Sequence, residues 1–436
     1  MSTAVIISIL IFTLTYIGII HRRVDRAVAA VSGAVAMILA GTYFKFYSQQ
    51  RALEAIDFNT IGLLMGMMIL VGVLGETGFF KYVAIKTAKL SKGSYYRLFA
   101  FFVLITALTS AFLDNVTTIL LMVPITITIA KDLNVNPTPF IISEVMASNI
   151  GGTATLIGDP PNIMIGSSAN INFTQFLLYL APIVLIVLFV VLLLFEIIFK
   201  DMLDGDMNEF KKIMTLDENQ SIVDWRLLKK TALVLLVTMI LFLVHHILGL
   251  DPWMVAITGA SLLLLLTLSD MEKTLNHVHW TTLIFFLGLF IIIGGLISAG
   301  VIDLIANRMV SVSENSLVFS LFMVIMIGGG LAIAVGNIPA SVMLIPAVAS
   351  FIEISGLGAG YPVNPLWWAL ALGTCFGGNG TLISAPTNLI AVNMSEKMGY
   401  PISFRNYARI GLPITLFILL LSFFLLYGFY VVLLGP

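Results

Sequence analysis

The chain has 436 residues, of which 59% are hydrophobic and only 10% are charged. A soluble domain carries roughly a quarter charged residues, so lipid must cover most of the surface of this chain. The formal net charge of −1 excludes a broad basic surface for nucleic acid. The single cysteine, Cys375, excludes a disulfide framework and a thiolate cluster. We expect no metal site and no cofactor.

The first predicted membrane span is the apolar stretch 4–20, which is followed by His21, Arg22 and Arg23. A cleaved secretory signal carries its positive charges before the apolar stretch, so this segment is interpreted as a span. Further spans are predicted near 25–43 and 58–80. The next apolar segment, 98–130, is too long for one crossing of ~30 Å at ~1.5 Å per residue. Its polar centre, Asp114–Thr118, predicts a re-entrant hairpin with two helical arms of about twelve residues each.

The rest of the chain repeats this pattern. Two more spans are predicted near 140–170 and 174–199, and a hydrophilic stretch follows them. The second series comprises spans near 231–248, 252–269, 280–300, 366–395 and 410–434, with a hairpin near 316–352. We therefore predict a first repeat at 1–199, a solvated cytoplasmic linker at 200–230 and a second repeat at 231–436.

Matching residues at nearly constant offsets support the repeat. At 222 positions Gly66 meets Gly288, Gly78 meets Gly300, and Asn115 meets Asn337; at 226 positions Gly151 meets Gly377, and Asn162 meets Asn388. An odd number of crossings in each half places the halves in opposite orientations. The sequence thus predicts an all-α polytopic membrane protein built as an inverted repeat, with five spans and one re-entrant hairpin in each half.

The distribution of positive charge predicts the orientation. When the loop after the first span is placed in the cytoplasm, only Lys45, Arg51 and Arg308 face outward, which leaves 22 − 3 = 19 of the 22 Lys and Arg on cytoplasmic segments. Cytoplasmic loops of membrane proteins are enriched in these residues. We expect a multi-pass protein of the cell membrane with both termini outside.

Broken helices predict where a solute binds. Transporters with inverted repeats place their sites near the middle of the membrane, where discontinuous helices meet. Gly, Pro, Asn and Thr gather at the two hairpin tips and within the fourth span of each half, and these side chains can satisfy freed backbone groups or contact a ligand. The candidate solute-binding residues are Asn115, Thr117, Asn149, Thr153, Thr155, Asn162, Asn337, Ser341, Asn379, Thr381 and Asn388.

Three acidic residues are candidates for ion coupling. Asp114 and Asp159 lie at break points, and Glu144 precedes Ser148 by one helical turn. Burying a carboxylate costs several kcal/mol unless it is protonated or paired, so such residues are candidate proton or cation carriers. The alternative for each aspartate is a hydrogen-bonding cap at the start of a half-helix. Their counterparts in the second half are not acidic, so the acid chemistry is predicted to be asymmetric.

The same motifs resemble a known family. Ser110–Thr118, Asn149–Asn162 and Gly377–Ile383 are similar to the ion transporter superfamily, in the branch of arsenical-pump permeases and the melanosomal P protein. The resemblance implies an elevator-type transporter, in which hairpins and broken helices form a mobile domain, usually as a homodimer. Gly336 departs from this branch, whose second hairpin commonly carries an aspartate at that point.

Several functions remain open on this evidence. The leading hypothesis is proton-coupled efflux of arsenite or antimonite, which the resemblance to arsenical-pump permeases implies. Buried carboxylates without buried bases agree with it, because arsenite is a neutral hydroxide at pH 7. The alternatives are sodium/proton antiport and symport of a small anion. A channel would belong to a different class. We do not expect an enzyme, because the sequence shows no nucleophile–base set.

Overall fold

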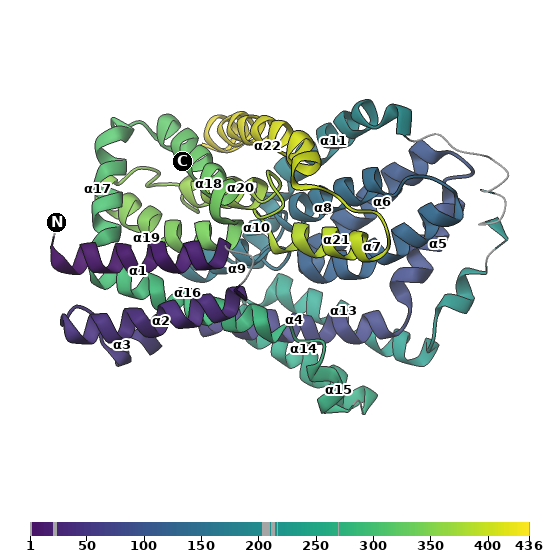
Figure 1. Ribbon diagram of the computed structural model, residues 1–436, viewed down its shortest axis with the longest axis horizontal. Coiled ribbons are helices and arrows are strands. Elements are labelled where there is room, and N and C mark those ends of the chain that lie inside the picture. The colour runs from purple at the N-terminus through teal and green to yellow at the C-terminus, as the bar shows by residue number, and fades with distance from the viewer. Residues whose placement is uncertain are drawn as a thin grey trace.

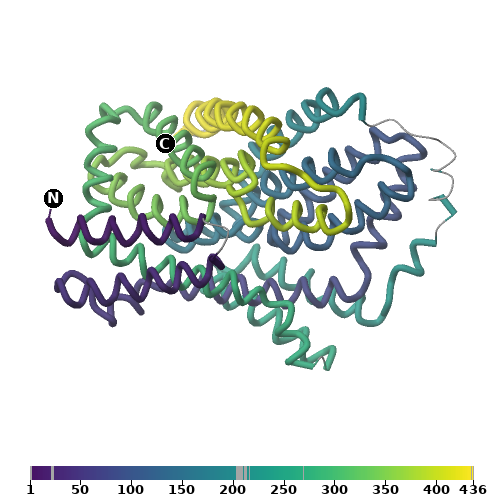
Figure 2. Tube along the Cα trace, in the orientation of Figure 1, coloured from purple at the N-terminus to yellow at the C-terminus, as the bar shows by residue number. Residues whose placement is uncertain are grey.

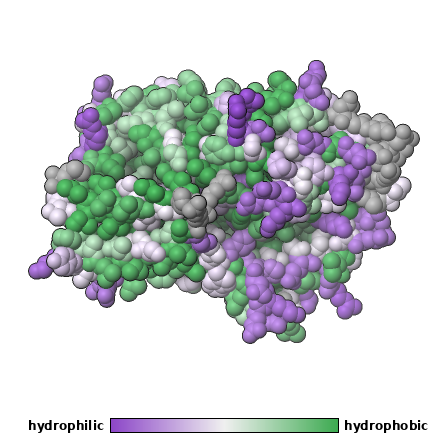
Figure 3. Space-filling view, in the orientation of Figure 1, coloured by the Kyte–Doolittle hydropathy of each residue, from purple (hydrophilic) through white to green (hydrophobic). Residues whose placement is uncertain are grey.

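The computed structural model describes residues 2–20, 24–202, 210, 214–215, 217–268 and 270–435. Within these ranges all regular secondary structure is helical, and 11 helices are long and apolar enough to cross a membrane. Apolar side chains cover much of the face in Figure 3, whereas polar ones gather near α15 and at the end opposite the N-terminus. Lipid is the natural solvent for such a surface, which confirms the predicted class.

In the described part of the first half there are eleven helices. They are α1 (Thr3–Ile20), α2 (Arg26–Tyr43), α3 (Gln49–Glu54), α4 (Phe58–Glu76), α5 (Phe79–Leu90), α6 (Tyr95–Phe112), α7 (Asn115–Asp132), α8 (Thr138–Gly152), α9 (Pro160–Ala169), α10 (Phe173–Tyr179) and α11 (Ala181–Ile198). The predicted fourth span is broken between α8 and α9, as its Gly and Pro residues indicate. The predicted third span ends at Glu76, because Gly78 turns the chain into α5.

The second half repeats this order after a short linker. The linker contains η1 (Lys200–Met202) and η2 (Glu218–Ser221). The helices that follow are α13 (Trp225–Val244), α14 (Pro252–Thr267), α15 (Met271–Leu275), α16 (Trp280–Ser298), α17 (Val301–Ser313), α18 (Leu317–Val335), α19 (Asn337–Ser355), α20 (Pro365–Gly377), α21 (Pro386–Lys397), α22 (Phe404–Leu426) and η3 (Tyr427–Leu434). Helix α13 begins inside the predicted linker, because Asp224 caps its N-terminus. Four residues assigned to the cytoplasm lie outside the described residues: Arg22, Arg23, Lys211 and Lys212.

Two helical hairpins reach the middle of the molecule from opposite ends. Helices α6 and α7 extend toward one end in Figure 1, and α18 and α19 extend toward the other. The predicted arm length of about twelve residues is wrong, because α6 and α7 have 18 residues each and α18 and α19 have 19 each. The tips are also shorter than predicted. Only Leu113 and Asp114 separate the first pair of arms, and only Gly336 separates the second.

Each half completes the packing of the other. Helix α4 of the first half lies against α14 of the second, and α16 lies against α2 (Figure 2). A Cβ atom added to Gly66 would lie 2.7 Å from the backbone carbon of Ala256, and one added to Gly288 would lie 2.7 Å from that of Ala30. Small residues let membrane helices approach this closely. The same glycine–alanine contact between helices of the two halves therefore occurs twice, as expected for a repeat.

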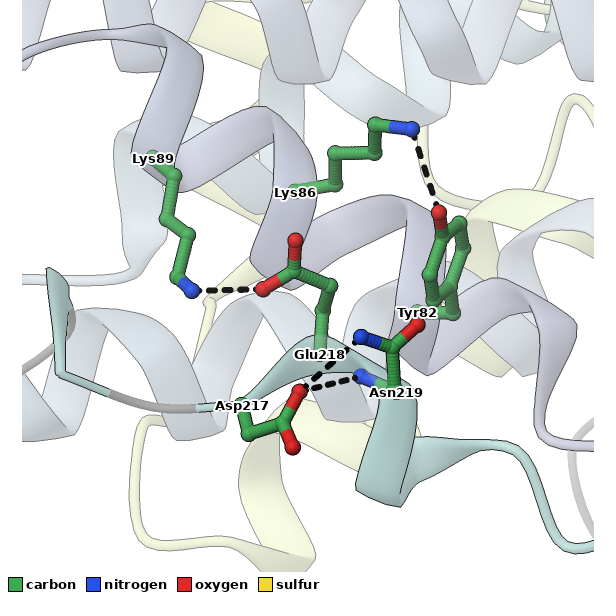
Figure 4. A network of polar contacts seen from close by, with 6 residues as sticks. All are labelled: Tyr82, Lys86, Lys89, Asp217, Glu218 and Asn219. Atoms are coloured by element: carbon green, nitrogen blue, oxygen red, sulfur yellow. Dashed lines mark hydrogen bonds and ion pairs between the residues drawn. The ribbon is translucent and has the colours of Figure 1, made fainter.

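Residues 217–223 of the linker contact the first half of the chain. Glu218 accepts a hydrogen bond from Lys89 Nζ at 2.5 Å, and this contact holds the pKa of the Glu218 carboxyl below its ordinary value (Figure 4). Asp217 orders the turn by accepting from the Asn219 backbone N–H at 3.0 Å. The segment 217–223 thereby lies across the junction of α4 and α5, where Val223 N donates to Thr77 O at 2.9 Å.

We expect Gly78→Ala to destabilise the protein more than Gly300→Ala. Both glycines have φ of +82°, which costs an L-residue about 1–2 kcal/mol. Only at Gly78 would the new Cβ meet another atom, Ser221 O at 1.9 Å, whereas nothing lies within 4 Å at Gly300. Thermal unfolding of the purified protein in detergent measures the difference. Equal losses of Tm in the two variants would show that the linker contributes nothing at this junction.

Candidate functional site

Asp159 lies between the two hairpin tips and is fully buried. Its Oδ1 accepts hydrogen bonds from Asn115 Nδ2 at 3.1 Å and from Asn337 Nδ2 at 3.3 Å. The side chain does not cap α9: the first two helical positions are prolines that carry no N–H, and the N–H of the third, Asn162, donates to the backbone oxygen of Asp159 at 2.9 Å. One carboxyl is therefore held by amides from both halves of the chain and is not used as a helix cap.

Asp114 has a different role in the structure. It precedes α7 and accepts hydrogen bonds from the backbone N–H of Thr117 at 2.9 Å and from the Thr117 hydroxyl. This is the geometry of an N-cap, which satisfies a backbone donor at the start of a helix. Asp114 and Asp159 still line the same narrow cavity. The two aspartates thus differ: Asp114 caps a helix at the hairpin tip, and Asp159 accepts hydrogen bonds from amides of both halves.

Three further amide contacts extend the cluster away from Asp159. Asn115 Nδ2 also donates to Asn149 Oδ1 at 3.2 Å. Asn149 Nδ2 in turn donates to Asn379 Oδ1 at 3.0 Å and to Asn388 Oδ1 at 3.1 Å. Among the described residues, Asn379 Nδ2 has no hydrogen-bond partner although it is buried. We call the five residues Asn115, Asn149, Asn337, Asn379 and Asn388 the amide cluster, and Asn379 gives it an open donor.

The break between α8 and α9 is held together by its own side chains. Asn162 Nδ2 donates to Thr153 O at 3.0 Å and to Thr155 O at 2.9 Å, and the Thr155 hydroxyl donates to Ala111 O. The Thr153 hydroxyl bonds back to Asn149 O at 2.8 Å. These contacts satisfy carbonyls that a continuous helix would have paired. Asn162, Thr153 and Thr155 therefore stabilise the break.

The break between α20 and α21 repeats this arrangement. Asn388 Nδ2 donates to Gly378 O at 2.8 Å and to Thr381 O at 2.7 Å. The Thr381 hydroxyl donates to Ile333 O at 3.2 Å, which is the counterpart of the Thr155 contact in the first half. Ser384 adds a hydrogen bond to Gly378 O at 2.7 Å. The two breaks are thus built by the same residue types at the same spacing.

Ser341 and Glu144 lie at the edges of this arrangement. The Ser341 hydroxyl donates to Asn337 O at 2.8 Å, one turn into α19. Glu144 is fully buried and accepts from the Thr126 hydroxyl at 2.6 Å, and its second oxygen has no partner among the described residues. No contact joins Glu144 to the amide cluster in the described structure, so its coupling role remains a prediction.

Gly336 explains why the second tip has no carboxylate. Its φ of +105° and ψ of 149° strain any residue with a Cβ, so glycine suits this position. The next residue is anchored by its backbone, because Asn337 N donates to Ser384 O at 2.8 Å. The second hairpin therefore presents an amide where the first presents both an amide and the Asp114 cap.

Two residues near Asp159 were not predicted from the sequence. His279 and Thr282, at the start of α16, line the same cavity as Asp159. Neither occurs in a motif of broken helices. At the same offset of 222 positions, His279–Thr282 falls against Asp57–Thr60, but this match gives no indication of the distance to the hairpin tips.

We expect Asn162→Ala to destabilise the protein strongly. Its Nδ2 pairs two buried backbone carbonyls, and each carbonyl left unpaired costs about 1–3 kcal/mol. The control is Asn393→Ala, because Asn393 is exposed on α21. Thermal unfolding in detergent distinguishes the two. A loss no larger than that of the control would mean that the break does not depend on the asparagine.

Comparisons with known proteins agree with this architecture. Residues 16–373 match the CitMHS family, described as citrate transporters. An uncharacterized transporter of Mycobacterium tuberculosis is 38% identical over 94% of this chain and 95% of its own length. The human P protein is 32% identical over 94% of this chain, which spans 58% of that protein. The structure of MtrF from Neisseria gonorrhoeae shares the fold, with a TM-score of 0.59, 12% identity and coverage of 97% and 98%.

Proposed function

The chain belongs to the CitMHS family of the ion transporter superfamily, and from this we propose that it is a proton-coupled secondary transporter whose carrier group is Asp159. The observation that supports the proposal is the position of this carboxyl between the two hairpin tips. Amides from both halves contact it, so a change in its charge acts on both hairpins at once. In the protonated state the same amides can turn to a solute.

The chemistry of the cavity favours a neutral solute with hydroxyl groups. Among the described residues that line the cavity around Asp159, none is Lys or Arg. Besides Asp159, the polar residues that line the cavity are Asp114, Asn115, His279, Thr282 and Asn337. An uncharged hydroxide such as arsenite or antimonite would find donors and acceptors there without a fixed cation. We therefore propose efflux of arsenite or antimonite in exchange for protons.

The proposal includes how the parts move. Helices α6–α9 and α18–α21, which carry the tips and the breaks, are assigned to a mobile domain, and the paired helices α2, α4, α14 and α16 to a fixed frame. Two such chains would form a homodimer, with both termini outside the cell. Support comes from the packing, because the frame helices contact one another across the halves.

We expect Asp159→Asn to abolish uphill arsenite uptake in everted vesicles under an imposed pH gradient, because an amide cannot carry the proton. Asp114→Asn should retain part of the uptake, since an asparagine still caps α7. The measurement is arsenite accumulation against time, with empty vesicles as the blank. Uptake by wild type no greater than the blank would exclude arsenite as the solute, and full uptake by Asp159→Asn would exclude Asp159 as the carrier.

A second candidate is the symport of a small carboxylate anion. The description of the family as citrate transporters favours it, and so does Arg26, which lines a cavity directly next to the second hairpin tip. Labelled citrate offered to the same vesicles tests this candidate. Citrate accumulation that also depends on Asp159 would show that the solute is an anion and not arsenite, and would support Asp159 as the carrier group.

A further inference from the structure

The start of α10 is joined to the end of α13 by three contacts. The Phe173 backbone N–H donates to His245 Nε2 at 3.4 Å, and the Thr174 hydroxyl donates to Leu243 O at 3.0 Å. The rings of Phe173 and Phe242 stack with their centroids 5.6 Å apart. Helix α10 follows α9 after only three residues, so these contacts also hold the end of α9 near α13.

His245 is held in place by the turn between α13 and α14. Its Nδ1 lies 2.7 Å from Leu250 O, and its backbone oxygen accepts from Leu250 N at 3.0 Å. A carbonyl oxygen can only accept, so Nδ1 carries the proton, and Nε2 is then the acceptor that the Phe173 N–H requires. Both contacts exist together only in the neutral imidazole, because both ring nitrogens of a protonated imidazole are donors.

A cavity of about 340 Å³ connects His245 to the surface. The His245 side chain is buried, but His246 and Gly249, which line the same cavity, are exposed. The other titratable residues that line it are His246 and Asp251, and the described lining residues of α4, α9 and the loop between α9 and α10 are uncharged. A proton can therefore reach the imidazole, and no described lysine or arginine lines the cavity to oppose its charge.

The equivalent position in the first half cannot make this contact. At the offset of 226 residues His245 corresponds to Ile19, whose side chain offers no acceptor. Ile19 lines a cavity of about 700 Å³ together with Ile402 and Ser403. The contact through His245 is therefore an addition to the repeated fold, which forms the equivalent place without it.

We propose that His245 is an acid-sensitive latch, which joins α10 to α13 while its imidazole is neutral and releases α10 when the imidazole takes up a proton. After protonation Nε2–H would face the Phe173 N–H, so the hydrogen bond is lost and two donors repel each other. The latch is thus closed at high pH and opens as the pH falls. The opening itself needs no solute. Its consequence for transport, the release of α9 next to Asp159 by protons on the predicted outer side, rests on the proposed function.

Hydrogen exchange of the wild-type protein in detergent tests the latch without transport. We expect residues 173–179 to lose protection at least about fivefold between pH 8 and pH 5, after correction for the intrinsic effect of pH on exchange, because histidine changes its charge in this range. Residues 338–348 of α19 contain no titratable group and are the internal control. Equal protection of α10 at the two pH values would overturn the latch. A chain that does not transport arsenite would still show the opening, so the two failures are distinguishable.

Three substitutions identify the group that titrates. His245→Asn keeps a donor for Leu250 O but offers Phe173 no acceptor, so α10 should be equally unprotected at both pH values. His246→Asn and Asp251→Asn remove the neighbouring titratable groups and should keep the wild-type response. A wild-type response in His245→Asn, or loss of the response in either control, would assign the opening to another group and overturn the proposal. Thermal unfolding at pH 8 shows which variants are folded, and the two controls decide the question where His245→Asn is not.

Discussion

The structure depends on one constraint: a helix that stops inside the membrane must still satisfy its backbone. Lipid offers no hydrogen bonds, so each carbonyl freed at a break needs an internal partner. Asn162 and Asn388 meet this need by reaching back across their own breaks. Once both breaks are fixed, the hairpin tips can approach them from opposite ends, and the carboxyl of Asp159 lies where the tips meet.

The symmetry of the scaffold and the asymmetry of the acids have separate physical origins. Packing requires the same small residues and amides in both halves, so the pairs Gly66/Gly288 and Asn162/Asn388 recur. Asp114 and Asp159 already line one cavity, so a further carboxylate at the second tip would add repulsion in a medium of low dielectric constant. At the second tip, Gly336 adopts a backbone conformation that disfavours any side chain. The paired glycines and asparagines therefore recur in both halves, whereas the acidic residues at the breaks do not.

Much of this fold was predictable, because hydropathy indicates the membrane spans and the repeat offsets indicate which residues occupy equivalent positions in the two halves. The breaks at Asp159 and near Gly378, and the two hairpins, follow from Gly, Pro and Asn in apolar segments. The lengths of the hairpin arms were underestimated because the polar residues near Thr117 belong to helix α7 and not to the tip. A helix that is buried against other helices tolerates Thr side chains. The contacts that distinguish Asp159 from the Asp114 cap needed coordinates, because Asn115 and Asn337, which donate to Asp159, are distant from it in the sequence. His279 was missed because its proximity is tertiary.

The exchange of helices between halves has a consequence for biosynthesis. Helices α2 and α4 are made early, but the surfaces that cover Ala30 and Gly66 belong to α16 and α14, which emerge from the ribosome much later. Until then the first half has inserted helices whose small-residue faces lack their partners. The packing of such a chain is completed only near the end of its synthesis. Until then the unpartnered helices of the nascent first half are exposed to quality control in the membrane.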